Sequence, residues 1–131
     1  MNITGSNPKE ALKLSKRVLG INPEVNAVYG NIATIAMENN LFDYIIPVFD
    51  DGISSNPNNL DLVYQRAILI GNQGDYVDAL IDFYKVVDQS ALADNPDLFS
   101  EDQISKDIEI SKVHLRLKIK IKIKRKNLYV L

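Results

Sequence analysis

A 34-residue period constrains the fold of this chain more than any other feature of its sequence. The pair Asn22-Pro23 returns 34 residues later as Asn56-Pro57. Other side chains follow the same interval: Ala33 with Ala67, Phe49 with Phe83, and Ala11 with both Ile45 and Ala79. An interval of this length is typical of stacked helical hairpins. The period therefore predicts an all-α, antiparallel helix-hairpin solenoid, an architecture that binds other molecules through the surface that stacking creates.

Apolar residues also recur at helical spacing, which supports helices independently of the period. The stripes are Leu12, Leu14, Val18 and Leu19; Tyr29, Ile32, Ala33, Ala36 and Met37; Val63, Ala67 and Ile70; and Ala79, Leu80, Phe83, Val86 and Val87. Each predicted helix therefore has one face that needs a partner. Because proline is comfortable only in the first turn of a helix, we expect the helix around Pro47 to begin near Asp43 or Tyr44, or to bend at the proline.

The residues in this register resemble the tetratricopeptide repeat (TPR), whose unit is two antiparallel helices with small residues at their crossing. In the second unit the matching residues are Ala67, the turn Gln73-Gly74-Asp75-Tyr76, Ala79 and Phe83. In the first unit they are Tyr29, Ala33, Phe42, Phe49 and the terminal Asn56-Pro57-Asn58-Asn59. The departures are Asn40 for the turn glycine, Ile45 and Gly52 for two further small residues, and Ala91 for the second proline. The resemblance covers residues 8–93 and implies a TPR-like superhelix.

The register predicts how the chain is organised. We expect a flexible N-terminus at 1–7, a half repeat at 8–25, TPR-like repeats at 26–59 and 60–93, a capping helix at 94–113 and a basic alternating tail at 114–131. Ser100-Glu101-Asp102-Gln103 reads as a capping box that starts the capping helix. Because such arrays usually need about three units, two and a half predict marginal stability. The half repeat indicates either a piece of a longer array or an exposed end used in self-association.

Charge is distributed unevenly along the chain. All 17 acidic residues lie at or before Glu109 with 7 basic ones, a balance of −10, whereas 8 basic residues and no acid follow from Ser111 onward. The acidic part argues against nucleic-acid binding by the array itself, because phosphate binding needs clustered Lys or Arg. The chain has no cysteine, so disulfide and thiol chemistry are not expected. We see no leader pattern and no apolar run of about 20 residues, so we expect a cytoplasmic location.

From His114 the apolar and basic residues alternate strictly. Leu115, Leu117, Ile119, Ile121 and Ile123 alternate with Arg116, Lys118, Lys120, Lys122 and Lys124. This is a strand pattern. Three interpretations stay open: a helical or disordered tail without a selected role, a strand added to another copy or protein, and a basic arm for RNA, DNA or acidic lipid. With Tyr129 as its one aromatic residue, the tail offers little base stacking.

No residue pattern predicts catalysis, a cofactor or a metal. His114 is the single histidine and has no cysteine or second histidine at metal-ligand spacing. Asp50 and Asp51 are adjacent, so a helix would point them about 100° apart rather than at one substrate atom. Gly71-Asn72-Gln73-Gly74 lacks the Lys-Ser/Thr of a phosphate loop. We therefore predict a protein that is not an enzyme.

The resemblance also implies where a partner binds, because the first helix of each TPR unit lines a concave groove. The matching positions are Ala27, Gly30, Asn31, Thr34 and Met37 in one unit and Asp61, Tyr64, Gln65, Ile68 and Asn72 in the other. The candidate binding residues are Asn31, Thr34, Asp61, Tyr64, Gln65 and Ile68. Tyr64 would be an aromatic anchor, and Asn31 and Gln65 would bond a peptide backbone. Family members that hold chaperone C-termini use Lys, Asn and Arg at certain of these positions, and this chain has Gly30, Thr34, Asp61, Tyr64 and Ile68 there. We therefore do not expect a clamp for chaperone C-termini.

The sequence thus predicts a noncatalytic scaffold that binds a protein or peptide. Two alternatives remain. The chain could be the repeat portion of a larger enzyme, such as a glycosyltransferase, or its basic tail could tether it to nucleic acid or to an anionic membrane. Self-association through the array ends or the tail is a further expectation.

Overall fold

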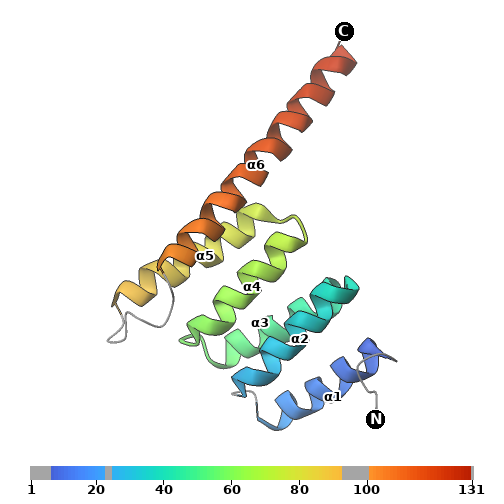
Figure 1. Cartoon of the computed structure of the whole chain (residues 1–131), viewed down its shortest axis with the longest axis vertical. Helices are drawn as coiled ribbons and strands as arrows, with labels where there is room; N and C mark the ends of the chain where they lie inside the picture. The colour runs from blue at the N-terminus through green and yellow to red at the C-terminus, as the bar shows by residue number, and fades with distance from the viewer. Residues whose placement is uncertain (1–6, 23–24, 93–100, 131) are drawn as a thin grey trace.

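The helices of this chain begin at regular intervals. The computed structural model describes residues 7–22, 25–92 and 101–130, and these form six α-helices and no strand (Figure 1). Helices α1 (Pro8–Ile21), α3 (Phe42–Ser55) and α5 (Tyr76–Leu92) begin 34 residues apart, as do α2 (Asn26–Asn39) and α4 (Leu60–Asn72). Helix α6 (Glu101–Val130) follows them. The predicted all-α helical repeat architecture is confirmed.

Residues 34 positions apart occupy the same sites in successive hairpins. Ala33 and Ala67 are each the eighth residue of their helix, and both are buried. Phe49 and Phe83 are likewise the eighth residues of α3 and α5, and they are 0% and 2% exposed. Phe49 packs against the Tyr29 ring with centroids 5.3 Å apart. The 34-residue period therefore marks buried residues that recur at equivalent positions in successive hairpins.

The turns between paired helices also repeat. Asn40 ends α2 in the left-handed conformation with φ 54°, and Gly74, 34 residues later, has φ 100° before α5. Asparagine is one of the few residues besides glycine that visits this region readily. Asn40 therefore takes the backbone conformation of the turn glycine that it replaces. At the other end of the array, the Asn7 side chain accepts a hydrogen bond from the Glu10 amide at 3.2 Å and caps α1 ahead of Pro8.

Pro47 lies inside a helix rather than in its first turn. Helix α3 begins at Phe42, slightly earlier than the expected start near Asp43 or Tyr44, so Pro47 is its sixth residue. A proline there has no amide hydrogen for the Asp43 carbonyl. The neighbouring Ile45 and Val48 are buried, so apolar packing of α3 offsets the lost hydrogen bond.

An ion cluster joins three helices of the array. Arg66 of α4 donates from Nε and Nη2 to the two carboxylate oxygens of Asp82 in α5 at 2.8 and 2.9 Å, and from Nη1 to Asp50 in α3 at 2.9 Å. Asp82 is 5% exposed. Its carboxylate needs this partner, because an ion without a partner is costly to bury. The Asp82 hydrogen bond comes first among the causes that raise the Arg66 pKa above its ordinary value.

Among the interpretations of the alternating residues, the helix is confirmed and the strand is wrong, because residues 101–130 form the single helix α6. A helix satisfies its backbone hydrogen bonds internally, whereas a strand needs a neighbour and the described residues provide none. The first half of α6 packs on α5 and buries Ile104, Ile108 and Ser111. Every residue from 116 to 127 is exposed, and Figure 1 shows this half of α6 extending beyond the other helices.

Several predictions concern residues outside the described ranges. They are the flexible N-terminus up to residue 6, Pro23 of the repeated pair, residues 94–100 of the capping helix, which include Ser100 of the capping box, and Leu131.

Candidate polypeptide-binding face

Helices α2, α4 and α6 lie in a row and form the face on which the predicted binding residues stand (Figure 1). At one end of α2 and α4, Asn59 Nδ2 donates to Asn26 Oδ1 at 2.8 Å. Near the other end, Asn72 Nδ2 approaches Met37 Sδ at 3.8 Å. The Tyr64 hydroxyl connects α4 to Asp107 of α6. We call this surface the α2–α4–α6 face.

All six candidate binding residues lie on α2 and α4 and keep accessible surface, and Tyr64 is half-buried. Asn31 and Thr34 are exposed, and Asp61, Gln65 and Ile68 are half-buried. Gln65 Nε2 donates to Asp61 Oδ2 at 3.1 Å, one turn away. The Thr34 hydroxyl donates to the Gly30 carbonyl at 3.1 Å. These residues offer amide, carboxylate and apolar groups, and their role in binding stays a prediction.

Tyr64, the predicted aromatic anchor, is engaged by the chain itself. Its hydroxyl donates to the Asp107 carboxylate, and its ring meets Phe83 edge-on with centroids 5.8 Å apart and planes at 68°. Gln103 donates to the other Asp107 oxygen at 3.1 Å. Burial, followed by the Asp107 hydrogen bond and charge, raises the Tyr64 pKa well above its ordinary value near 10. Tyr64 therefore attaches α6 to α4, a contact that the repeat pattern gave no means of predicting.

A cleft of about 230 Å³ opens between α4, α5 and α6 beside this contact. Its lining includes the apolar side chains of Ile68 and Phe83 and the polar ones of Asn72, Asp107 and His114. Ligand pockets typically measure about 300–1,000 Å³, so this volume suits one large side chain of a partner better than a cofactor. The sequence identified Ile68 and Asn72 as groove positions, but not the wall supplied by α6.

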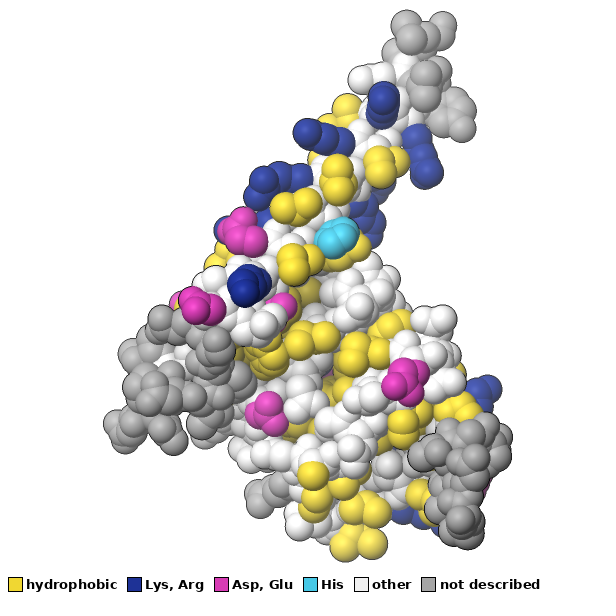
Figure 2. Space-filling view, in the orientation of Figure 1, with side chains coloured by type: hydrophobic (Ala, Val, Ile, Leu, Met, Phe, Trp, Pro, Cys, Tyr) yellow, Lys and Arg dark blue, Asp and Glu magenta, His cyan; other side chains and the backbone are white. Residues whose placement is uncertain are grey.

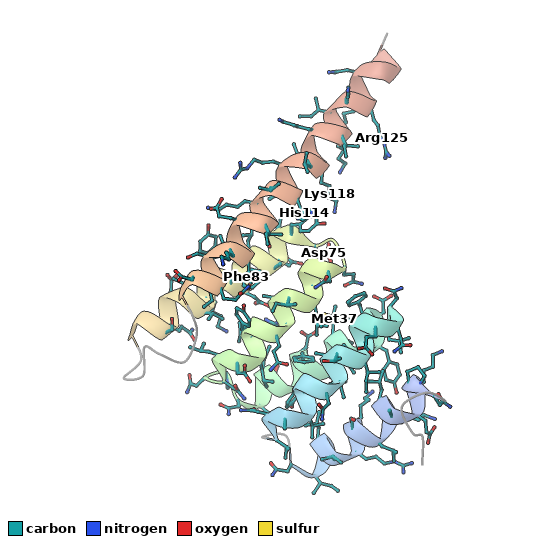
Figure 3. All side chains as sticks on the ribbon, viewed as in Figure 1. Met37, Asp75, Phe83, His114, Lys118 and Arg125 are labelled. Carbon is teal, nitrogen blue, oxygen red and sulfur yellow. The ribbon has the colours of Figure 1, made fainter. Side chains whose placement is uncertain are left out.

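His114 forms one edge of the cleft. Its ring stacks on Tyr76 with centroids 5.3 Å apart and planes at 15°, and its Nδ1 lies 2.9 Å from the Ile110 carbonyl oxygen. Figure 3 shows His114 and Lys118 on the part of α6 beside the array, with Arg125 far beyond it. The stacking gives His114 a structural role at the edge of the cleft.

Charge is sparse on the α2–α4–α6 face over α2 and α4 and dense on α6. Figure 2 shows mostly apolar and uncharged surface over α2 and α4, and Lys and Arg side chains gathered along the extending part of α6. The surface over α2 and α4 is therefore nearly neutral and partly apolar. Such a surface suits an uncharged or amphipathic polypeptide rather than a phosphate backbone.

The adjacent aspartates Asp50 and Asp51 and the Gly71–Gly74 segment belong to the helical array. Asp50 and the adjacent Asp51 are both exposed, and Asp50 pairs with Arg66. The Gly71–Gly74 segment forms the end of α4 and its turn into α5. Among the described residues no group of three or more His, Cys, Asp or Glu side chains could hold a metal ion. No helix of the described part is long and apolar enough to cross a membrane.

Comparison with known proteins supports the fold. No protein-family model matches the sequence, and no curated protein matches it. The solved structure of MamA AMB-1, a protein containing TPRs, matches with a TM-score of 0.59 and 16% sequence identity. The match covers 87% of this chain and 62% of the MamA chain, so this chain spans less than two thirds of that structure. At this identity the likeness shows the fold alone, a TPR-like helical solenoid.

Proposed function

We propose that this chain is a noncatalytic scaffold that binds a polypeptide segment of a partner across the α2–α4–α6 face. The observation that carries the proposal is the row of first helices, which presents accessible amide and apolar side chains on a face with little charge. The TPR-like fold supports a role in protein interaction, because stacked hairpins create extended binding surfaces. We propose residues 26–59 and 60–93 as the repeat units.

The proposed ligand is an extended or helical segment that carries one large apolar side chain. That side chain would enter the cleft beside Ile68 and Phe83, and the Asn31 and Gln65 amides would bond the peptide backbone. Asn31 is exposed, and Gln65 needs only to release Asp61, its partner on the same helix. Tyr64 would contribute its ring edge and keep its hydroxyl on Asp107. The expected cytoplasmic location stays a prediction.

Selection of peptides from a random display library against the purified chain tests this proposal. We expect selected peptides to share an aromatic or large aliphatic residue. The double variant Asn31→Ala/Gln65→Ala should bind them at least about tenfold more weakly, a loss of about 1.4 kcal/mol, because two backbone hydrogen bonds are removed. Ile68→Arg should reduce affinity further by filling the cleft with a charge. Circular dichroism would establish that both variants keep their helices.

The matched control is Ser54→Ala/Asp88→Ala, which truncates two exposed residues of α3 and α5 away from the α2–α4–α6 face. It should leave peptide affinity unchanged. Equal affinity of the wild type, the double variant and Ile68→Arg would refute the assignment of the binding face. Tyr64→Ala would not separate the two effects, because the loss of its contact with Asp107 would disturb α6 as well as a bound peptide.

A further inference from the structure

The extending half of α6 has a surface that the chain itself does not use. We call residues 116–127 the projecting segment. All of them are exposed, including Leu117, Ile119, Ile121 and Ile123, which are each about half exposed. Lys118 is near the base of this segment, where its Nζ donates to the Gly74 carbonyl at 3.1 Å.

On a helix, the alternating sequence produces two apolar stripes rather than one. Residues two positions apart are about 200° apart around a helix, and residues four apart are neighbours on one face. Val113, Leu117 and Ile121 therefore form one stripe, and Leu115, Ile119 and Ile123 form a second one on nearly the opposite side. Basic residues fill the two sectors between them. The projecting segment therefore has apolar surface to bury on two sides.

The projecting segment has little to stabilise it as a helix within a single copy of the chain. Its residues are exposed, with Lys118 bonded to the array at its base, and most of the stability of protein helices comes from tertiary packing of an apolar face. Like charges four residues apart, such as Arg116 with Lys120 and Lys120 with Lys124, destabilise it further. The alternating isoleucines are only moderate helix formers. A docked partner with acidic and apolar groups would relieve the repulsion and bury the stripes.

The two-stripe geometry restricts the class of partner. A membrane surface would bury one stripe and leave the other in water. Nucleic acid would neutralise the lysines, but its phosphates would leave both stripes uncovered. A second copy of α6 would place like charges against each other. The partner that fits is a protein groove with carboxylates around apolar side chains.

Such a groove exists on this chain, between α3, α4 and α5. It has a volume of about 390 Å³, and its apolar surface comes from Ile46, Ile70 and Ile81, the last being 61% exposed. Four aspartates and one arginine line it, a formal charge of −3. Arg66 forms ion pairs with two of these aspartates, Asp50 and Asp82. Asp75 and Asp78 are exposed and make no side-chain hydrogen bond or ion pair with any described residue. Both also line a small cavity of about 110 Å³ with Leu115 and Lys118, where α6 of the same chain passes the array.

We propose that the projecting segment of one copy docks in this acidic groove of a second copy. Charge complementarity carries the proposal: the segment is basic on two sectors, the groove is acidic, and both expose isoleucine. The chain cannot fill its own groove with this segment, because α6 passes the α4–α5 turn at Lys118 and then extends away from the array, where Figure 3 shows Arg125.

This contact joins two different surfaces, so a pair of copies keeps one free groove on one copy and one free segment on the other. Heterologous contacts of this kind produce rings or open chains of copies rather than closed dimers. The groove is separate from the α2–α4–α6 face. The proposed function and this self-association therefore succeed or fail independently.

The test uses two full-length variants and sedimentation velocity. Asp75→Lys/Asp78→Lys changes the formal charge of the groove from −3 to +1 and leaves the sequence of the segment unchanged. Lys120→Gln/Lys122→Gln/Lys124→Gln removes three charges from the segment and leaves the groove intact. We expect the wild type to gain mass with concentration, and each variant alone to remain a monomer. An equimolar mixture should form two-chain complexes that grow no further, because only one intact segment and one intact groove can meet.

Salt and a charge-matched control complete the test. Wild-type assembly should weaken from about 0.1 M to about 1 M salt, where the screening length falls from about 10 Å to about 3 Å. Glu38→Lys/Asp88→Lys reverses two exposed acids outside the groove and should assemble like the wild type. A wild type that stays monomeric in low salt, a mixture that stays monomeric, or a segment variant that assembles normally would overturn the proposal. So would a segment that associates only with added RNA or anionic vesicles.

Discussion

Gly52→Ala is a small substitution for which the structure predicts a measurable loss of stability. Gly52 is buried in α3 against Tyr29 of the preceding helix. A Cβ at residue 52 would lie 2.5 Å from Tyr29 Oη and 2.9 Å from Cζ. Tyr29 is 1% exposed and packs on Phe49, so its ring has little space into which it can move. The glycine, which replaces a small residue of the TPR pattern, is thus required by the tyrosine beside it.

Two opposing terms set the size of the effect. Overpacking in a well-packed core costs about 1–3 kcal/mol. Replacing glycine by alanine in a helix returns about 1 kcal/mol through helix propensity. Because the added carbon meets buried ring atoms rather than a flexible side-chain end, we place the cost at the upper part of its range. The net loss is then about 1–2 kcal/mol, or about 4–8 °C in Tm.

Gly30→Ala is the matched control, because a Cβ there would meet nothing within 4 Å. The same substitution in the interior of α2 should raise Tm by about 2–4 °C. Tyr29→Phe combined with Gly52→Ala should recover part of the loss, since it removes the hydroxyl at the closest contact. Thermal unfolding followed by circular dichroism measures all of these. If Gly52→Ala stabilised the protein as much as Gly30→Ala, the predicted contact between α2 and α3 would be wrong.

Three further predictions concern the packing and ion pairs of the array. Ala67→Leu, at a fully buried crossing point, should destabilise the fold by about 1–3 kcal/mol in urea unfolding. Arg66→Met should cost about 2–4 kcal/mol by leaving the Asp82 carboxylate buried without its partner, and Arg66→Met/Asp82→Leu should recover much of it; equal stability of both variants would contradict this. Because the Tyr64 pKa is raised on folding, its contribution should be fully present below about pH 10 and decline as the pH rises further. Tyr64→Phe should make that alkaline decline shallower, and an unchanged slope would exclude Tyr64 as its source.

The sequence predicted the repeat architecture because the 34-residue period marks positions where helices must approach closely. Ala33 and Ala67 are buried at equivalent sites, and Phe49 and Phe83 fill equivalent spaces. Even the departure at Asn40 preserves the backbone conformation of the turn. These constraints act between residues that are close in sequence or one repeat apart. They therefore produce a regular pattern in the sequence, from which the repeat can be predicted.

The role of α6 could not be predicted in the same way. Alternation of apolar and basic residues is compatible with a strand when one face is buried, but no neighbouring strand exists among the described residues. The contact between Tyr64 and Asp107 joins residues 43 positions apart and belongs to no repeat. Likewise, Arg66 pairs with Asp82, whereas the residue 34 positions earlier is Ile32, which cannot form an ion pair. Single tertiary contacts such as these leave no periodic signal.

The candidate binding residues could be predicted only as positions on a face. Helical register places Asn31, Thr34, Gln65 and Ile68 on one surface of α2 and α4, and they are accessible there. The cleft between α4 and α6 depends on α6, whose docking the sequence did not reveal. The face therefore follows from the repeat, and the shape of its cleft follows from contacts outside it.

The most direct test of the central claim is nuclear magnetic resonance of the isotopically labelled full chain titrated with a library-selected peptide. We expect the largest amide shift changes on the α2–α4–α6 face, at Asn31, Thr34, Gln65 and Ile68, with little change at exposed positions of α3 such as Ser54. Shift changes confined to α1, α3 and α5 would contradict the proposed binding face.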